Sequence, residues 1–268
     1  MRTPLLNRGV RRTAVTALLI ALLAAIPAAA QAPIFPLAVK AKLTDCHTGP
    51  LLADRFAVFV GQMPALQGTR RMWMRFDLFE RTAASGRWQR LVVPKFGTWQ
   101  KSLPGKPGFI YEKRVDQLQA PADYRAEVRF RWYDAQGELQ RQTRRRTPTC
   151  HEPDPRPDLA VGTVTATDAD SGRLRYVIRV RNDGRSDVGP FAAVLSVDGA
   201  AQPPVTIAGL PAGGATKLAI IARACTPGSR IQIALDPAGT VDEARETNNA
   251  VSRACPTPSS PRLHWTEL

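Results

Sequence analysis

The chain has 268 residues, of which 44% are hydrophobic and 22% are charged. This composition is ordinary for a globular protein, so it excludes a disordered or fibrous chain, and the length allows one or two domains. The formal net charge is +14, and the three histidines and four cysteines supply few groups for a metal or nucleophile site.

The first thirty residues have the three parts of a secretory signal peptide. Residues 2–12 carry four arginines, residues 17–26 are entirely apolar, and residues 28–30 are alanines that suit a cleavage site. The apolar run is shorter than the roughly 20 residues that a membrane span needs. We therefore expect residues 1–30 to be removed before Gln31, which leaves a secreted or periplasmic protein with no transmembrane segment.

A proline-rich stretch divides the rest of the chain. Residues 153–157 (PDPRP) predict a stiff linker between a domain over residues 31–152 and a second over residues 158–256, with residues 257–268 as a flexible tail. The first domain holds 21 Lys and Arg against 11 Asp and Glu, whereas residues 153–268 hold 12 of each. The basic excess of the mature chain therefore belongs to the first domain.

Alternating side chains predict strands in the first domain. In residues 71–78 and 124–132, apolar positions alternate with arginine and other polar residues, which is the period of a half-buried strand. Tyr124 stands where the tyrosine corner of an immunoglobulin-like sandwich would stand, with its hydroxyl bonded to backbone a few residues upstream. We predict an immunoglobulin-like β-sandwich in which these two strands are central neighbours.

The outward side of these strands is the strongest functional lead. Arginines with interleaved aromatic rings could hold an anionic polymer by charge and stacking. The alternative is a solvated arginine surface whose side chains only cover the sheet. The candidate binding residues are Arg71, Trp73, Arg75, Arg125, Arg129, Arg131, Tyr133, Arg144, Arg145 and Arg146.

The positive net charge and the expected compartment together limit the classes of binding partner. An anionic envelope glycan, the phosphates of lipopolysaccharide or an acidic protein fits both, whereas nucleic acid fits only the charge. The alternatives are a structural or assembly subunit of an envelope complex that makes its contacts through sheet edges, or an accessory domain of a secreted enzyme. We expect no catalysis and no cofactor, because the chain lacks the hydrolase, nucleotide and metalloprotease motifs G-x-S-x-G, G-x-x-x-x-G-K-[ST] and H-E-x-x-H.

The second domain also has the pattern of an antiparallel sandwich, since seven short strands are separated by Gly, Pro, Asp and Asn. The predicted strands cover residues 159–167, 173–182, 191–198, 203–208, 216–224, 229–236 and 248–255. The acidic segment 168–172 (DADSG) is better explained as a hairpin turn than as a calcium loop, because it lacks the longer ligand series and the closing Glu.

Residues 157–255 contain a series of short motifs, namely PDLAV (157–161), VRNDG (180–184), VDG (197–199), GLPAG (209–213), Asp236-Pro and, most specifically, VDEARETNN (241–249). On these motifs, the segment resembles CARDB, the cell-adhesion-related domain found in bacteria. It implies a seven-stranded immunoglobulin-like sandwich in a secreted or surface protein, serving as a spacer or interaction unit with no reaction of its own.

The most specific phrase also holds a carboxylate pair. Glu243 and Glu246 could do acid–base work at a suitable separation. The resemblance favours a connecting loop instead, in which Asn248 and Asn249 satisfy backbone groups. We therefore interpret Glu243, Asn248, Asn249 and the preceding Asp236 as structural.

The four cysteines predict disulfides, since the chain is expected in an oxidising compartment. Three pairings are available, and economy within each domain favours Cys46–Cys150 and Cys225–Cys255, each contributing roughly 2–4 kcal/mol. The alternative is a zinc site that adds His47 and His151. It is disfavoured because neighbouring residues of a strand point to opposite faces, so we expect no metal.

Overall fold

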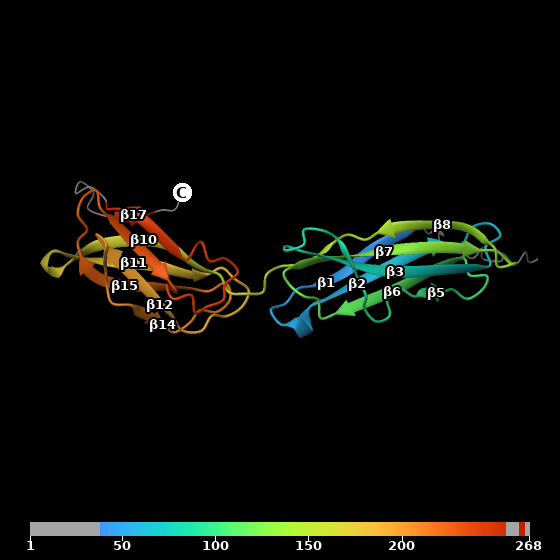
Figure 1. Ribbon diagram of the computed structural model, residues 1–268, viewed down its shortest axis with the longest axis horizontal. Helices are drawn as coiled ribbons and strands as arrows, with labels where there is room; N and C mark the ends of the chain where they lie inside the picture. Colours follow the sequence, from blue (N-terminus) through green and yellow to red (C-terminus); the bar gives the residue numbers. More distant parts are fainter. Residues whose placement is uncertain (1–37, 256–262, 266–268) are drawn as a thin grey trace, which may run out of the picture. The chain divides into compact units, whose positions relative to one another are not determined.

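The computed structural model describes residues 38–255 and 263–265, which form two β-sandwiches (Figure 1). The predicted signal peptide, residues 1–30, lies outside the described residues. No helix in the described parts of the chain is long and apolar enough to cross a membrane. The expected all-β class is confirmed.

The N-terminal sandwich is built from antiparallel strands in two sheets. Its elements are β1 (Lys40–His47), the 3-10 turn η1 (Leu52–Asp54), β2 (Phe56–Pro64), β3 (Arg71–Thr82), β4 (Gln89–Leu91), β5 (Trp99–Lys101), β6 (Gly108–Asp116), β7 (Ala122–Tyr133), β8 (Leu139–Arg146) and β9 (Cys150–Glu152). One sheet has the order β1-β2-β6 and the other β4-β3-β7-β8, with β5 also paired to β3 and β9 to β7. The two long strands predicted from alternation are β3 and β7, and they are neighbours as expected.

Alternation explains how the N-terminal core forms. Met74 of β3 lies opposite Phe130 of β7, and both are fully buried, as are Phe76 and Trp132. Successive side chains of a strand face opposite sides of the sheet, so the polar residues between them are turned outward. The Trp132 indole donates a hydrogen bond of 2.7 Å to the carbonyl oxygen of Pro64, which links β7 to the opposing sheet.

Tyr124 makes the contact predicted for a tyrosine corner. The side chain is 1% exposed, and its hydroxyl lies 3.0 Å from the carbonyl oxygen of Gln119, five residues upstream. The same hydroxyl lies 2.6 Å from Glu80 Oε1. The segment before β7 is thereby fixed to the start of that strand.

The C-terminal sandwich also has two antiparallel sheets. Its elements are β10 (Leu159–Ala169), the 3-10 turn η2 (Asp170–Gly172), β11 (Arg173–Asn182), β12 (Phe191–Val197), β13 (Ala200–Ala201), β14 (Val205–Ile207), β15 (Ala215–Arg223), β16 (Arg230–Leu235), β17 (Ala250–Ala254) and β18 (Leu263–Trp265). The orders are β15-β11-β10-β18 and β13-β12-β16-β17, with β14 paired to β12.

All seven predicted strands of this sandwich are present. The acidic segment 168–172 forms the tight β10–β11 turn as expected, with Ser171 and Gly172 at positive φ of 61° and 70° and Ala169 paired with Arg173. One prediction is wrong in part, because the tail residues 263–265 form β18 on the edge of β10. A three-residue strand carries too few alternations for its sequence to reveal it.

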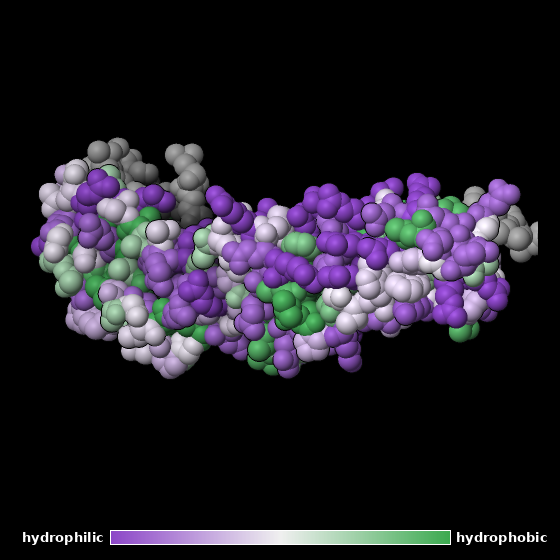
Figure 2. Space-filling view, turned by 45° about the vertical axis from the view of Figure 1, so that its right-hand side comes forward, coloured by the Kyte–Doolittle hydropathy of each residue, from purple (hydrophilic) through white to green (hydrophobic). Residues whose placement is uncertain are grey.

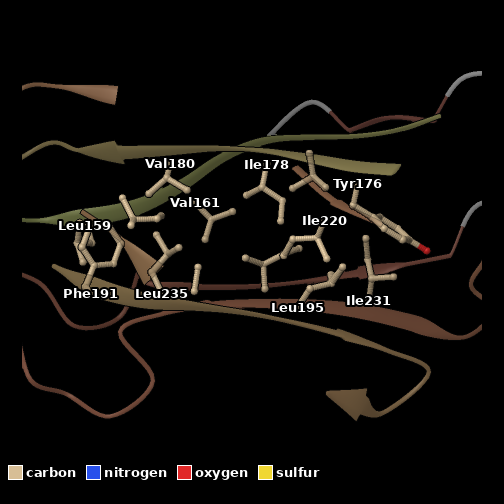
Figure 3. Close-up of a cluster of buried hydrophobic side chains, with 14 of the residues drawn as sticks. Leu159, Val161, Tyr176, Ile178, Val180, Phe191, Leu195, Ile220, Ile231 and Leu235 are labelled. Atoms are coloured by element: carbon tan, nitrogen blue, oxygen red, sulfur yellow. The ribbon is translucent and has the colours of Figure 1, made fainter. Parts of the chain in front are cut away.

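The core of the C-terminal sandwich follows the same period of two. Figure 3 shows side chains of both sheets converging between the layers, among them Ile178 of β11, Leu195 of β12 and Ile231 of β16. All three are fully buried. This core uses residues 159–235, whereas the core of the N-terminal sandwich uses residues 57–150.

Both disulfides form in the favoured pairing. Cys46 of β1 is bonded to Cys150 of β9, with Cα atoms 5.5 Å apart, and Cys225 is bonded to Cys255, with Cα atoms 5.8 Å apart. The first bond joins the earliest and latest strands of the N-terminal sandwich. The second joins the residues that follow β15 and β17.

Candidate functional site

The predicted binding residues of β3 and β7 lie together on one surface. The register places three pairs directly opposite one another, namely Arg71 with Tyr133, Trp73 with Arg131, and Arg75 with Arg129. We call the outward side of the β4-β3-β7-β8 sheet, with β5, the outer face. Arg125 joins it further along β7, opposite Phe79.

The arginine run of β8 is split by the sheet. Arg144 lies opposite Arg129 and Arg146 opposite Glu127, so both belong to the outer face. Arg145 lies opposite the buried Val128 and therefore on the other side of the strand. The prediction that all three arginines share one surface is wrong, because consecutive strand residues alternate in direction.

Two buried acids lie beneath these arginines. Asp77 is 1% exposed, and its Oδ1 accepts contacts of 2.9 Å from Arg75 and 2.7 Å from Arg90, while Oδ2 lies 3.4 Å from Arg129 Nε. The carboxylate therefore contacts three guanidinium groups, one each from β3, β4 and β7. Sequence alternation placed Asp77 outward but gave no sign of this role.

Glu127 is the second of these acids. Its Oε1 lies 3.7 Å from Arg129 and 3.8 Å from Arg144, and its Oε2 lies 3.5 Å from Arg146. Five arginines thus share two carboxylates, which leaves three positive charges in excess. The short contacts with Asp77 hold Arg75 and Arg90 in place, which lowers the entropy that a ligand would have to remove, whereas Arg144 and Arg146 remain 70% and 59% exposed.

Aromatic rings support the remaining cations of the outer face. At one end, the Arg131 guanidinium lies 4.4 Å from the centre of the Trp99 ring, and Lys101 Nζ lies 4.3 Å from that of Trp73. Trp73 in turn contacts Tyr133, with ring centres 4.5 Å apart. These contacts combine cation–π attraction with apolar surface that sugar rings can stack on.

The other end of the face repeats the arrangement. Arg125 lies 3.9 Å and Arg81 4.9 Å from the centre of the Trp88 ring. Burial, followed by the positive charges of Arg146 and Arg81, lowers the pKa of Arg125 from its usual value.

Sequence analysis missed several basic and aromatic residues of this surface. Arg81 lies on β3 itself, and Trp88, Arg90, Trp99 and Lys101 are brought beside β3 by the short strands β4 and β5 and the residue before β4. A signal was present, since residues 88–90 (WQR) and 99–101 (WQK) share the pattern aromatic, glutamine, basic. Such short strands have too few residues to show a period.

A depression of about 400 Å³ lies between β7 and β8. It is lined by Arg129, Phe130, Arg131, Gln142, Thr143 and Arg144. Guanidinium groups around a concave surface can bind a carboxylate, sulfate or phosphate through two parallel hydrogen bonds.

On the side of the molecule seen in Figure 2, hydrophobic residues form only small patches among hydrophilic ones.

The loop after β16 in the C-terminal sandwich is held by its own polar side chains. Asp236 has a positive φ of 41°, and its carboxylate accepts hydrogen bonds of 2.7 Å from Thr240 Oγ1 and from the Val241 N–H. Asn248 Nδ2 donates a bond of 2.8 Å to Asp158 Oδ1. These contacts close the loop against the residue that precedes β10.

Glu243 is the centre of this loop. It is 1% exposed, and its Oε2 accepts 2.5 Å from the Leu159 N–H while Oε1 accepts 2.7 Å from Asn249 Nδ2. The pKa of Glu243 is raised to about 7. Burial is the largest cause, the Leu159 hydrogen bond opposes it, and the nearby charge of Glu246 adds to the rise. Both oxygens are thus occupied by the protein itself. Asn248 and Asn249 were expected to satisfy backbone groups, but the side-chain amides donate to the carboxylates of Asp158, Glu243 and Glu246 instead.

The C-terminal sandwich matches a known family. The family model CARDB matches residues 156–253, which include β10 to β16 and most of β17. The C-terminal sandwich belongs to the CARDB family. The buried Glu243 and the loop it closes lie within the matched residues, whereas residues 31–152 lie outside the match.

Many solved structures match parts of this chain, and three of them cover different shares of it. The CARDB domain of the PF1109 protein from Pyrococcus furiosus, solved in complex with di-metal ions, is 24% identical, covers 36% of this chain and 84% of its own, and has a TM-score of 0.32. Red sea bream transglutaminase is 9% identical, with 82% and 31% covered and a TM-score of 0.32. The class 5 fimbriae chaperone CfaA is 11% identical, with 81% and 100% covered and a TM-score of 0.27. No curated protein matches the sequence.

The cysteine–histidine zinc alternative does not fit the geometry. Among the described residues, the cluster with metal-ligand spacing is Cys46, Cys150 and Glu152, and its two sulfurs are bonded to each other. His47 stacks on Phe56 instead, and His151 Nδ1 lies 2.6 Å from Asp123 Oδ1. Each histidine thus points away from the cysteine beside it, as strand geometry requires.

Proposed function

We propose that this chain is a non-catalytic binding protein of the envelope or extracellular space. Its N-terminal sandwich holds an anionic polymer on the outer face, and its CARDB domain serves as a spacer or protein-contact module. Residues 153–157 act as the linker between the two. Two disulfides support an oxidising compartment, where such bonds persist.

One observation carries the proposal, namely that fixed guanidinium groups and aromatic rings alternate on one sheet. Arg131 is stacked on Trp99, and Arg129 and Arg144 flank it around the same depression. Charge attracts a polyanion from a distance, and the rings add contact with sugar units once it is bound. An anionic envelope glycan offers both negative charges and sugar rings, whereas an acidic protein segment would contact the face through its negative charges alone.

Removing Arg131 and Arg144 tests the proposal on the mature chain from Gln31. We expect Arg131→Ser/Arg144→Ser to bind immobilised lipopolysaccharide and polyuronate at least tenfold more weakly, because each charge-assisted hydrogen bond contributes about 1.5–3 kcal/mol. Affinity should be measured across a salt series, since contacts with exposed charges weaken as salt rises.

Lys40→Ser/Lys42→Ser is the matched control, because it removes the same charge from exposed positions on the other sheet. The control should bind like the unmodified chain. Equal losses in the two variants would show that affinity follows net charge alone, and the outer face would then have no special role.

A further inference from the structure

A second basic surface lies on the CARDB domain, although the charges of residues 153–268 balance. The outward side of β11 and β15 carries six basic residues, and we call it the second basic face. They are Arg173, Arg175, Arg179 and Arg181 on β11, and Lys217 and Arg223 on β15. Period-two alternation gathers these charges on one side, where Asp183 and Asp198 are the acids that approach them within the described residues.

Like charges face each other across these two strands. Arg173 is paired with Arg223 in the register, but the Arg223 guanidinium donates a hydrogen bond of 2.7 Å to the carbonyl oxygen of Val197 in β12. The like-charged pair that faces across the two strands is Arg179 and Lys217, which lie directly opposite each other. Like charges in such positions destabilise a sheet, because their side chains are within reach of each other. The fold therefore tolerates a repulsion that a bound anion would remove.

Few acids neutralise this surface. Arg181 pairs with Asp183 at 3.1 Å, and Arg223 approaches Asp198 at 4.0 Å. Within the part of the chain that the structure describes, Arg175, Arg179 and Lys217 form no ion pair. This contrasts with the outer face of the N-terminal sandwich, where two buried carboxylates hold five arginines.

The chemistry between the charges argues against a protein or a bilayer as the partner. Both would need aromatic or large apolar anchors. Between its cations this face offers Val177, Ala219 and the half-exposed Ile221, and no aromatic ring. Arg179 and Lys217 instead border a shallow depression of about 600 Å³.

We propose that the second basic face binds a linear polyanion through charge alone. Residues two apart on a strand are about 6.8 Å apart, so the arginines of β11 form a row that repeated anionic groups can follow. The polyanion needs phosphate, sulfate or carboxylate groups and no particular sugar. This site lies on a different sandwich from the proposed outer-face site and does not depend on it.

The substitution Lys217→Glu gives two opposite readouts in the full mature chain. It turns the repulsive Arg179–Lys217 pair into an attractive one, so the thermal unfolding midpoint should rise. At the same time it removes a contact and adds an anion, so affinity for polyphosphate should fall at least tenfold, with a shallower salt dependence. Dextran sulfate and polygalacturonate, used in parallel, distinguish the anionic group.

Arg230→Glu is the matched control, since it makes the same charge change on the other sheet of the same sandwich. It should leave the affinity within twofold. Repeating the series in the Arg131→Ser/Arg144→Ser background isolates this face from the outer face. The proposal is overturned if Lys217→Glu and Arg230→Glu weaken binding equally, if neither does, or if only vesicles of anionic lipid bind.

Discussion

Replacing Glu243 with alanine is expected to lower the free energy of unfolding of the CARDB domain by about 3 kcal/mol. The substitution leaves the buried Leu159 N–H without its acceptor and removes the 2.7 Å acceptor of the Asn249 amide, which keeps a longer hydrogen bond of 3.3 Å to Glu246 Oε2. A buried polar group that loses its partner costs about 1–3 kcal/mol, and two such groups are affected here. Urea unfolding of the mature chain, followed by circular dichroism, measures the loss.

Asp242→Ala is the comparison, because Asp242 lies beside Glu243 in the same loop but its side chain is 83% exposed. Among the described residues its ion pair is with the half-exposed Arg156, so the loss should stay below about 1 kcal/mol. If Glu243→Ala unfolded at the same urea concentration as Asp242→Ala, Glu243 would not hold the loop.

The ionisation of Glu243 adds a pH dependence with a definite sign. In the folded domain its pKa is raised from 4.5 to about 7. Between pH 4.5 and about pH 7, the Glu243 carboxyl group stays protonated in the folded domain but is ionised in the unfolded chain. The free energy of unfolding therefore falls as pH rises through this range and is constant above about pH 7. The fall amounts to roughly 3 kcal/mol at 1.4 kcal/mol per pH unit.

Glu243→Gln isolates that effect, because glutamine keeps the shape and carries no titrating proton. We expect its stability to change less than that of the unmodified chain between pH 5 and pH 8, the difference being the contribution of Glu243. Identical pH profiles for the two proteins would mean that the carboxyl group titrates normally in the fold.

The second large effect is expected at Asp77. Asp77→Ala leaves Arg75, Arg90 and Arg129 facing one another with no carboxylate between them. Breaking a buried ion pair costs about 3–5 kcal/mol, but these arginines are 23–49% exposed, so we expect a loss of about 2 kcal/mol. Calorimetry in low and high salt measures it, and 1 M salt should recover part of the loss by screening the repulsion.

The same variant separates two explanations of the outer face. Asp77→Ala raises the net charge by one, so a face that acted through charge alone would bind anionic polymers more tightly. A face that acts through fixed guanidinium groups should bind more weakly, and we expect this outcome. Asp45→Ala makes the same charge change on exposed β1 and serves as the control.

The long strands could be predicted because one face of each is buried. In β3, β7 and β11, apolar and polar residues alternate over enough positions to fix both the strand and its orientation. The short strands β4, β5 and β18 have three residues each, which is less than two full periods. Their pairing depends on neighbours that are distant in sequence.

The candidate sites were harder to predict for a related reason. Asp77 and Glu127 stand at outward positions like any solvated acid, and only the register of β3 against β7 shows them opposite each other beneath five arginines. The second basic face could not be predicted from the net charge of residues 153–268, which is zero. A net charge does not show how the charged residues are distributed in space. Spatial segregation of charge needs the strand partners, which local sequence does not specify.

The Cys46–Cys150 bond has a mechanical consequence. It joins two residues that are 104 positions apart, with β2 to β8 between them. Tension applied along the backbone from both sides would pass through the sulfur–sulfur bond and bypass those strands. The bond Cys225–Cys255 protects only a 30-residue span, so β10 to β15 of the CARDB domain would carry the load. Under pulling along the backbone, the CARDB domain would extend first, and the outer face of the N-terminal sandwich would keep its shape.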